Sequence, residues 1–385
     1  MQSPPSYTTG LYIHIPFCAA KCDYCDFLSF TIDESRCRLY IDALINEISQ
    51  YKKISQYKSS IPIDTIYIGG GTPTVLPARL LQSLFDALPA AAPNAEITCE
   101  ANPGTLDEEK IALLAAAGVN RISMGLQAWQ AALLENIGRR TTREAFLENY
   151  KALRNVGFKN INLDIMFALP GQSLTDWEET LSEVCALGPE HISAYSLTPE
   201  ENTPLWSRLQ SGSCPEIPDE ETDRLMYHSC KDFLNKQGYQ QYEISNFCKP
   251  GFESRHNLRY WTRKAYKGLG LAAHSFEAES FPALRYSNTD NFELYIKGEW
   301  RNQQESNTIT KTEAMAEHMF LGLRLSAGVS ISAFTKEFCT SPQKAYGAWI
   351  NKMKNEKLLK EERGHLSLTA LGMDLANIVM AGFLE

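Results

Sequence analysis

The chain has 385 residues, 44% of them hydrophobic and 10% aromatic, which is ordinary for a globular protein with one large domain and a smaller one. Its formal net charge is −9, from 37 Lys and Arg against 46 Asp and Glu, which argues against general binding to nucleic acids or anionic membranes. No apolar run is long enough to cross a bilayer, and the first ten residues lack the features of a signal peptide, so we expect a cytoplasmic protein.

Short β-branched runs alternate with amphipathic helical stretches from residue 11 to about residue 198. The predicted strands cover residues 11–16, 64–71, 95–103, 120–127, 160–167 and 190–197. The predicted helices between them cover residues 34–57, 77–88, 107–117, 129–156 and 173–187. Strands separated by helices indicate right-handed βαβ units and a parallel sheet. Six such units are too few for a closed eight-stranded barrel, so we predict an α/β fold built on an open, partial barrel.

Polar residues gather where these predicted strands end. Besides the cysteines after the first strand, they are Gly70, Gly71, Thr72, Glu100, Asn102, Gln127, Asp164, Ser196 and Thr198. In parallel barrels the ligand site is built at the carboxyl ends of the strands. We therefore expect these six strand ends to converge on one site.

The alternation stops after residue 198. A helix is predicted near 219–237, followed by an irregular segment, and from about residue 310 the pattern is mainly helical: 311–325, 330–338, 342–356, a short strand at 366–369 and a last helix ending at 384. This C-terminal part is typical of a small winged-helix-like unit. We predict three parts: a partial barrel (1–198), a connecting segment and barrel extension (199–309), and a winged-helix-like domain (310–385).

Three of the ten cysteines, Cys18, Cys22 and Cys25, fall within eight residues, whereas the other seven are scattered singly. Thiolates are the ligands of iron–sulfur clusters, and a cubane normally takes four of them. Three close thiolates without a nearby fourth would leave one iron open to a chelating ligand. A zinc site is the alternative, but such sites usually use two close pairs of Cys or His, and no second pair is nearby. We predict a 4Fe–4S cluster, and we interpret the scattered cysteines as buried hydrophobic residues.

The stretch from Tyr12 to Cys25, in register with the Gly-Gly-Gly-Thr-Pro-Thr sequence of residues 69–74, closely resembles a known family. It is the radical S-adenosylmethionine (SAM) family related to oxygen-independent coproporphyrinogen III oxidase, and the resemblance covers nearly the whole chain. It implies a partial (βα)6 radical SAM barrel, or three-quarter TIM barrel. It also implies that SAM binds the open iron of the cluster, whose electron can cleave the sulfur–carbon bond of SAM.

The resemblance further assigns cofactor-binding residues. Those expected to contact SAM are Tyr12, Tyr24, Gly70, Gly71, Thr72 and Glu100. The positions of Gln127, Arg139 and Asp164 match residues that surround a second SAM molecule in the related oxidases. From the sequence alone, Asp164 lies in an otherwise apolar strand and must find a partner there. Arg139 could pair with it and Gln127 could contribute its amide, although a purely structural ion pair is the alternative.

The sequence departs from the oxidase pattern at the cysteine motif. The oxidases have a further cysteine two residues after the third, where this chain has Phe27, and they carry a longer segment before the residue matching Tyr12. Both differences match the branch of HemW-type heme chaperones.

A second motif favours the same branch, since residues 256–261 (HNLRYW) fit its His-Asn-x-x-Tyr-Trp pattern. We expect His256 to supply an imidazole to heme iron and Tyr260 and Trp261 to pack on the porphyrin. Three arginines in this segment could pair with the propionates: Arg255, Arg259 and Arg263. A structural histidine is the alternative reading of His256, and His274 is a second possible ligand.

These observations predict a heme chaperone that binds heme, transfers it to an unidentified acceptor protein, and carries a 4Fe–4S cluster and SAM. The first alternative is an oxygen-independent coproporphyrinogen III oxidase, and Phe27 argues against it. The second is a radical enzyme acting on another tetrapyrrole, and the motif at His256 argues against that. No catalytic residue is assigned. We expect no nucleic-acid partner, and membrane contact only if the acceptor is membrane-bound.

Overall fold

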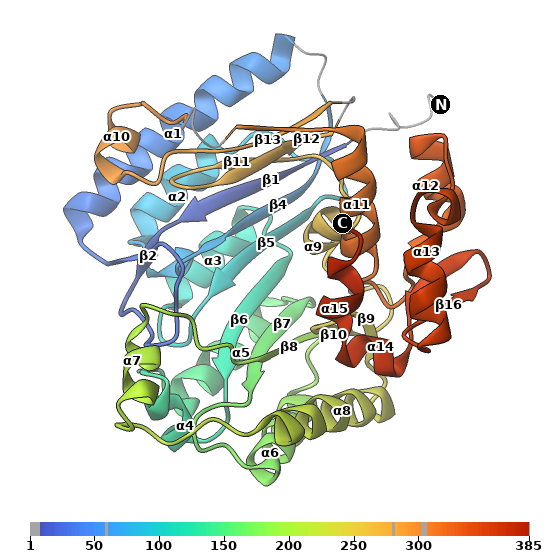
Figure 1. Ribbon diagram of the computed structural model, residues 1–385. Helices are drawn as coiled ribbons and strands as arrows, with labels where there is room; N and C mark the ends of the chain where they lie inside the picture. The colour runs from blue at the N-terminus through green and yellow to red at the C-terminus, as the bar shows by residue number, and fades with distance from the viewer. Residues whose placement is uncertain (1–7, 58–60, 279–281, 302–305, 385) are drawn as a thin grey trace.

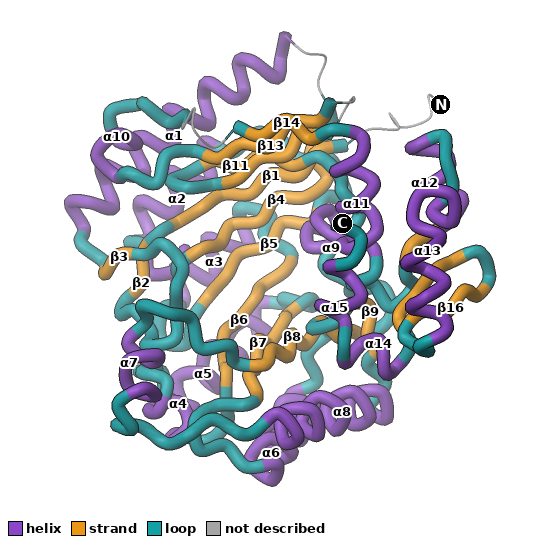
Figure 2. Tube along the Cα trace, in the orientation of Figure 1, coloured by secondary structure: helices purple, strands orange, loops and turns teal. Residues whose placement is uncertain are grey.

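A computed structural model describes residues 8–57, 61–278, 282–301 and 306–384. A single twelve-stranded sheet curves through the molecule, helices cover its outer face, and a smaller helical unit lies at one side (Figures 1 and 2). The order of the strands is β14-β13-β12-β11-β1-β4-β5-β6-β7-β8-β10-β9.

The six predicted strands form the parallel centre of this sheet and are confirmed. They are β1 (Thr9–Ile15), β4 (Ile63–Gly70), β5 (Glu96–Ala101), β6 (Arg121–Gln127), β7 (Ile161–Phe167) and β8 (His191–Ser196). They do not close on themselves, so the fold is the predicted partial barrel, with an inner and an outer face, and its two outermost strands pair with further strands of the sheet.

Helices connect these strands across the outer face. They are α1 (Glu34–Tyr57), α2 (Ala78–Ala87), α3 (Glu108–Ala116), α4 (Ala131–Asn136), α5 (Arg143–Val156) and α6 (Leu174–Leu187). The single helix predicted over 129–156 is wrong, because Gly138 has a φ of 69° and ends the first helix before α5 begins. The break places Arg139 in a loop, where its side chain can reach inward.

Strand β1 shows why the outer face of the sheet packs on helices and the inner face carries polar side chains. Leu11, Ile13 and Ile15 are fully buried and join a core that includes residues of α1, whereas the alternate residues Tyr12 and His14 are only half-buried. Side chains of successive strand residues point to opposite faces. The apolar set therefore holds α1, and the polar set faces the interior of the barrel.

The sheet continues past both ends of the barrel, in strands that the sequence pattern did not predict. Beyond β1 lie β11 (Tyr266–Leu269), β12 (His274–Glu277), β13 (Ala283–Ser287) and β14 (Asn307–Ile309); beyond β8 lie β10 (Asn246–Cys248) and β9 (Gln240–Glu243). Between them come α7 (Pro204–Gln210), α8 (Glu220–Lys236), α9 (Arg255–Trp261) and α10 (Phe292–Ile296). The segment expected to be irregular thus contains β10 and α9.

The C-terminal part is mainly helical, as predicted, and includes a small antiparallel sheet. Its elements are α11 (Lys311–Gly322), β15 (Val329–Ser330), α12 (Ile331–Phe338), α13 (Pro342–Asn355), β16 (Leu359–Glu362), β17 (His365–Leu368), α14 (Ala370–Asp374) and α15 (Ala376–Ala381). Its own apolar core includes Phe334, Phe338 and Ile350 and also takes in Phe276 and Ile309 from the extended sheet. The domain boundaries at 198 and 309 remain predictions. Within the described ranges, no helix has the length and apolar character needed to span a membrane.

Candidate cluster and cofactor site

The three clustered cysteines lie in the loop that follows β1. This loop runs between the short parallel strands β2 (Phe17–Cys18) and β3 (Phe30–Thr31), at the carboxyl end of the barrel (Figure 1). Cys18, Cys22 and Cys25 are all half-buried and form no disulfide. Burial raises the pKa values of Cys18 and Cys25.

Two donors reach these thiols from other elements. The hydroxyl of Thr72 donates to Cys18 Sγ at 3.8 Å, and Nη1 of Arg139 donates to Cys22 Sγ at 3.7 Å. Asn102 connects the two donors, because its Nδ2 donates to the Thr72 hydroxyl at 2.6 Å and its Oδ1 accepts from Arg139 at 2.7 Å. Such donors stabilise sulfur in its thiolate form, which is the form that ligates metals.

Two contacts with helix α7 hold the cysteine loop in place from outside the barrel. Asp23 lies between Cys22 and Cys25. Its carboxylate forms an ion pair with Arg208 of α7 at 2.7 Å. Its backbone carbonyl also accepts from the Leu205 N–H at 2.8 Å. Neither partner is apparent from the local sequence, because both lie more than 180 residues away from Asp23 along the chain.

Within the described residues, no three His, Cys, Asp or Glu side chains converge as the ligands of one metal ion would. A cubane is compatible with more widely spaced thiols, because each cysteine bonds a different iron.

The glycine-rich turn packs directly beneath the cysteine loop. Gly70 ends β4 with a φ of 114°, in the region that favours glycine, and the Thr72 N–H donates to the Phe17 carbonyl at 2.7 Å. A Cβ atom at Gly71 would lie 2.5 Å from that same carbonyl oxygen. A side chain at Gly71 would therefore displace the backbone leading to Cys18 as well as crowd any cofactor.

Glu100 projects from the end of β5 into the barrel. Its carboxylate accepts from the Tyr67 hydroxyl at 2.7 Å and from the Gly70 N–H at 3.0 Å. Burial raises the pKa of Glu100 to about 7. No ion pair of the described part of the chain includes this carboxylate, so a cationic group bound beside it would be strongly favoured.

Asp164 occupies the corresponding inner position on β7. It accepts from Asn162 at 2.8 Å and from Ser123 at 3.2 Å, and burial raises its pKa. Arg139, the possible charged partner, forms no ion pair with Asp164 in the described chain, because its guanidinium donates to Asn102 and to the carbonyl of Gly125. The β6–β7 ladder satisfies Asp164 locally and leaves Arg139 free to contact the cysteine loop.

The remaining predicted cofactor residues line the same interior. Tyr12 packs on Tyr67 with ring centroids 6.2 Å apart, and its hydroxyl lies 2.9 Å from His14 Nδ1. The other ring nitrogen of His14 is buried without a hydrogen-bond partner in the described chain. Tyr24 and Gln127 are on the cysteine loop and at the end of β6.

Taken together, these observations fit a positively charged ligand. Among the described residues neither Glu100 nor Asp164 forms an ion pair, although the Arg121 charge favours the ionised form of both, and His14 carries an unused polar atom. SAM carries a sulfonium and an ammonium, so its charges complement the two carboxylates. The residues present therefore fit the predicted cofactor.

The His256 motif lies at the other end of the barrel. Helix α9 packs against the amino ends of β4 and β5, opposite the cysteine loop (Figure 1). The backbone N–H of His256 donates to Glu96, the first residue of β5, at 3.0 Å. The cysteine loop follows β1 at the carboxyl ends of the same strands, so the barrel separates the two motifs.

His256 presents no free nitrogen in this arrangement. The side chain is 1% exposed, its Nδ1 lies 2.9 Å from the Thr65 hydroxyl, and its Nε2 lies 3.0 Å from the Tyr260 hydroxyl. Burial lowers its pKa to about 3. The expectation of an imidazole directed at iron is therefore not met by this structure, because hydrogen bonds occupy both ring nitrogens.

The neighbours of His256 are engaged in similar ways. Arg259 is buried and forms an ion pair with the half-buried Asp64, and Arg263 contacts Glu317 at 3.0 Å. Arg324 lies over the Trp261 ring, 4.3 Å from its centroid. Only Arg255, of the three arginines in this segment, is exposed, so two of the three are not available to propionates.

Tyr67 is the functional neighbour that sequence reasoning missed. Its hydroxyl binds Glu100, and its ring packs on His256 with centroids 5.3 Å apart. Tyr67 thus connects the carboxylate of Glu100 with His256 of α9 through the barrel interior. Its place in β4, two residues before Gly69 on the same face, was the available signal.

Comparison with known proteins agrees with this architecture. The Radical SAM superfamily matches residues 12–184, and the HemN C-terminal domain matches residues 309–375. Heme chaperone HemW of Lactococcus lactis is 38% identical over 100% of this chain and 98% of its own, and heme chaperone HemW of Bacillus subtilis is 37% identical over 97% and 98%. The structure of Escherichia coli coproporphyrinogen III oxidase HemN superposes with a TM-score of 0.84 over 98% of this chain and 90% of its own, at 20% identity, which shows the shared fold. The chain therefore belongs to the HemW family of radical SAM proteins.

Proposed function

We propose that this protein is a heme chaperone, which binds heme and passes it to an acceptor protein. The observation that carries the proposal is the full-length similarity to relatives named as heme chaperones, at 38% and 37% identity. Phe27, where the oxidases have a further cysteine, supports the same function, and its side chain is 65% exposed.

In this proposal Cys18, Cys22 and Cys25 hold a 4Fe–4S cluster, and SAM binds beside it. Together these groups supply one-electron chemistry when they are bound. Thr72 and Arg139 stabilise negative charge on the cysteine sulfurs through the contacts described above. The cluster is thus held in a polar, half-buried loop.

Residues on the barrel interior then bind the cofactor. Glu100 and Asp164 attract its positive groups, Gly70 and Gly71 permit close approach of the backbone, and Tyr12 packs along one side. Tyr24 and Gln127 complete the lining. Since both carboxylates are buried, their attraction for a cation is only weakly screened by solvent.

Heme is proposed to bind away from His256. The contacts of this histidine stabilise α9 against β4. We propose that Tyr260 and Trp261 likewise stabilise this region and do not contact heme. We place the transfer of heme in the cytoplasm, with an acceptor that is unidentified and membrane contact only where that acceptor is itself in a membrane.

Anaerobic reconstitution followed by two parallel assays tests the function. We expect the reconstituted protein to bind hemin in a 1:1 complex and to form no protoporphyrinogen from coproporphyrinogen III. Multiple turnovers of coproporphyrinogen, without hemin binding, would instead establish the oxidase alternative.

A further inference from the structure

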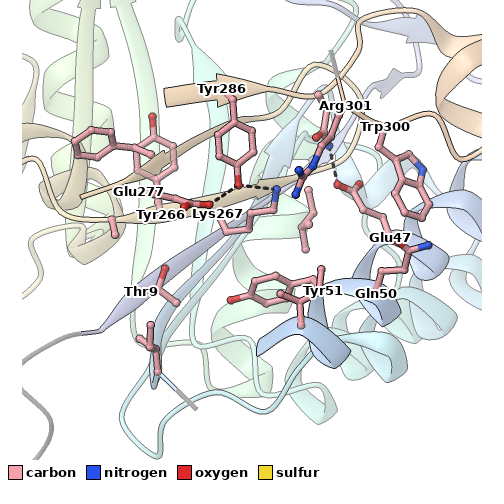
Figure 3. A pocket seen from close by; sticks show the side chains of 16 residues that line it. Thr9, Glu47, Gln50, Tyr51, Tyr266, Lys267, Glu277, Tyr286, Trp300 and Arg301 are labelled. Carbon is pink, nitrogen blue, oxygen red and sulfur yellow. Dashed lines mark hydrogen bonds between the residues drawn. The ribbon is translucent and has the colours of Figure 1, made fainter. Parts of the chain in front are cut away.

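A cavity of about 230 Å³ lies between helix α1 and the outer face of the sheet extension formed by β11–β13 (Figure 3). It shares no lining residue with the cysteine loop or with the SAM residues proposed above. The buried residues Leu269 and Asn288 form its floor, and the exposed residues Ile54 and Arg301 lie at its rim. The cavity is therefore a second, separate place where a ligand can bind.

Aromatic rings form much of its wall. Tyr51, Tyr286 and Trp300 line it, and Ile54, an apolar residue 51% exposed, stands at its mouth. The indole N–H of Trp300 is buried without a hydrogen-bond partner among the described residues. Flat apolar walls with a few polar groups are typical of sites for planar ring ligands.

Two cations converge in this cavity. Figure 3 shows the side chains of Lys267 and Arg301 directed toward one another beside the hydroxyl of Tyr286. The Lys267 ammonium makes two long contacts, 3.4 Å each, to the hydroxyls of Tyr286 and Ser275, and it appears in no ion pair of the described chain. An incompletely paired ammonium in a half-buried site favours an anionic ligand.

The carboxylates that line the cavity do not fill this role. Glu47 accepts hydrogen bonds from Gly270, Tyr295 and Asn288 at 2.7–2.9 Å. Glu277 accepts from the Tyr286 hydroxyl at 2.9 Å. Both carboxylates act on the Lys267 charge through space, and Arg301 opposes them, but neither carboxylate forms an ion pair with Lys267 in the described chain. An added carboxylate would therefore be the first to contact Lys267 directly.

We propose that this cavity binds the carboxylate-bearing edge of a tetrapyrrole, with Lys267 and Arg301 pairing with the carboxylates. This inference rests on the proposed heme function and names where that ligand sits. The volume is below the ~300–1,000 Å³ of sites that enclose a whole ligand. One edge of the macrocycle enters, therefore, and the rest stays exposed at the rim, where an acceptor protein can reach it.

The cavity also gives the His256 motif a physical connection to ligand binding. Tyr260, hydrogen-bonded to His256, packs edge-on against Tyr266 with centroids 4.7 Å apart. Tyr266 lines the cavity and immediately precedes Lys267 on β11. The motif helix thus positions one wall of the cavity without touching the ligand.

The test uses the full-length reconstituted protein and two metal-free probes, protoporphyrin IX and its dimethyl ester, followed by fluorescence. The wild type is expected to bind the free acid about tenfold or more tightly than the ester. Lys267→Met is expected to remove that preference, and Lys267→Arg to retain it. Lys53→Met, an exposed position on α1 outside the cavity, is the matched control and is expected to behave as wild type.

The outcomes separate this inference from the proposed function. If the wild type binds hemin but Lys267→Met and Arg301→Met bind the free acid as the wild type does, the cavity is not the site and heme binds elsewhere. If the wild type binds neither hemin nor the free acid, the heme function itself fails, and the inference fails with it.

Discussion

The Nε2 atom of His256 lies 3.0 Å from the hydroxyl oxygen of Tyr260, one helical turn further along α9. With the Thr65 hydroxyl at 2.9 Å on the opposite nitrogen, the imidazole joins this helix to strand β4. The motif that first indicates heme binding therefore serves, in this structure, to fix one end of the barrel.

Replacing His256 by Ala is expected to lower the free energy of unfolding by about 2–4 kcal/mol, because it removes two hydrogen bonds of a buried imidazole and opens a cavity. Urea denaturation of the two proteins measures the difference. His274→Ala, at an exposed position, is the control and is expected to change it by less than about 0.5 kcal/mol. Equal stability of His256→Ala and wild type would contradict the structural role.

The buried imidazole also predicts a direction for acid sensitivity. Because the pKa of His256 is lowered to about 3 in the folded protein, from 6.5, the folded state binds fewer protons at this group than the unfolded state. Its contribution to stability is full above pH 6.5 and is lost as the pH falls toward 3. His256→Gln, which cannot titrate, is expected to show a shallower loss across that window. Identical slopes for the two proteins would exclude His256 as a source of the dependence.

The cysteine loop predicts which thiols carry the cluster. Cys18→Ala, Cys22→Ala and Cys25→Ala should each abolish the iron–sulfur absorbance after anaerobic reconstitution, because each removes one of three ligands. Cys99→Ala is the matched control, since that thiol is fully buried in the barrel core and should leave the absorbance unchanged. Loss of the cluster from all four variants alike would refute the assignment.

The raised pKa of Glu100 predicts that SAM binding depends on pH. The raised pKa of about 7 means that the carboxyl loses its proton only near neutrality, and the charged form is the one that attracts a cation. The affinity for SAM should rise between about pH 6 and about pH 8, and the dependence should be absent in Glu100→Gln. Calorimetric titration of the reconstituted protein measures both. A pH dependence that persists in Glu100→Gln must come from another group.

The same carboxyl opposes folding of the cofactor-free protein as the pH rises. Because its pKa is higher in the folded state than the ordinary 4.5, its contribution to stability is complete below pH 4.5 and declines as the pH rises through about 7. Cofactor-free Glu100→Gln should therefore gain stability relative to wild type between pH 6 and pH 8, as measured by thermal unfolding at the two values. No relative gain would indicate that the carboxyl is not desolvated.

Much of the barrel was predictable because its signals are local. The six parallel strands and most of the helices follow from alternating apolar runs and the segments between them. The polar groups after β1, β4 and β5 meet, since Thr72 contacts both Cys18 and Asn102, whereas Ser196 at the end of β8 is exposed and donates to Asp223. The same reasoning missed the strands from β9 to β14, which are short and depend on pairing with distant partners for their stability.

The errors at the site have a similar cause. The sequence offers Arg139 and Gln127 as possible partners of Asp164, but Ser123 and Asn162 donate to it instead, and only the register of β6 against β7 reveals this. His256 was expected to face a ligand because of its neighbours in sequence. Its partner Thr65 comes from a strand 191 residues away, which no local pattern indicates.

The most direct test of the central claim is transfer of heme from the protein. The full-length, reconstituted chain is loaded with hemin and mixed with a heme-depleted extract of host cells, and the rate at which heme appears in the extract's heme proteins is compared with the rate from hemin bound to serum albumin. A heme chaperone is expected to transfer heme faster than albumin does, with no protoporphyrinogen formed from added coproporphyrinogen III. Transfer no faster than from albumin would contradict the account.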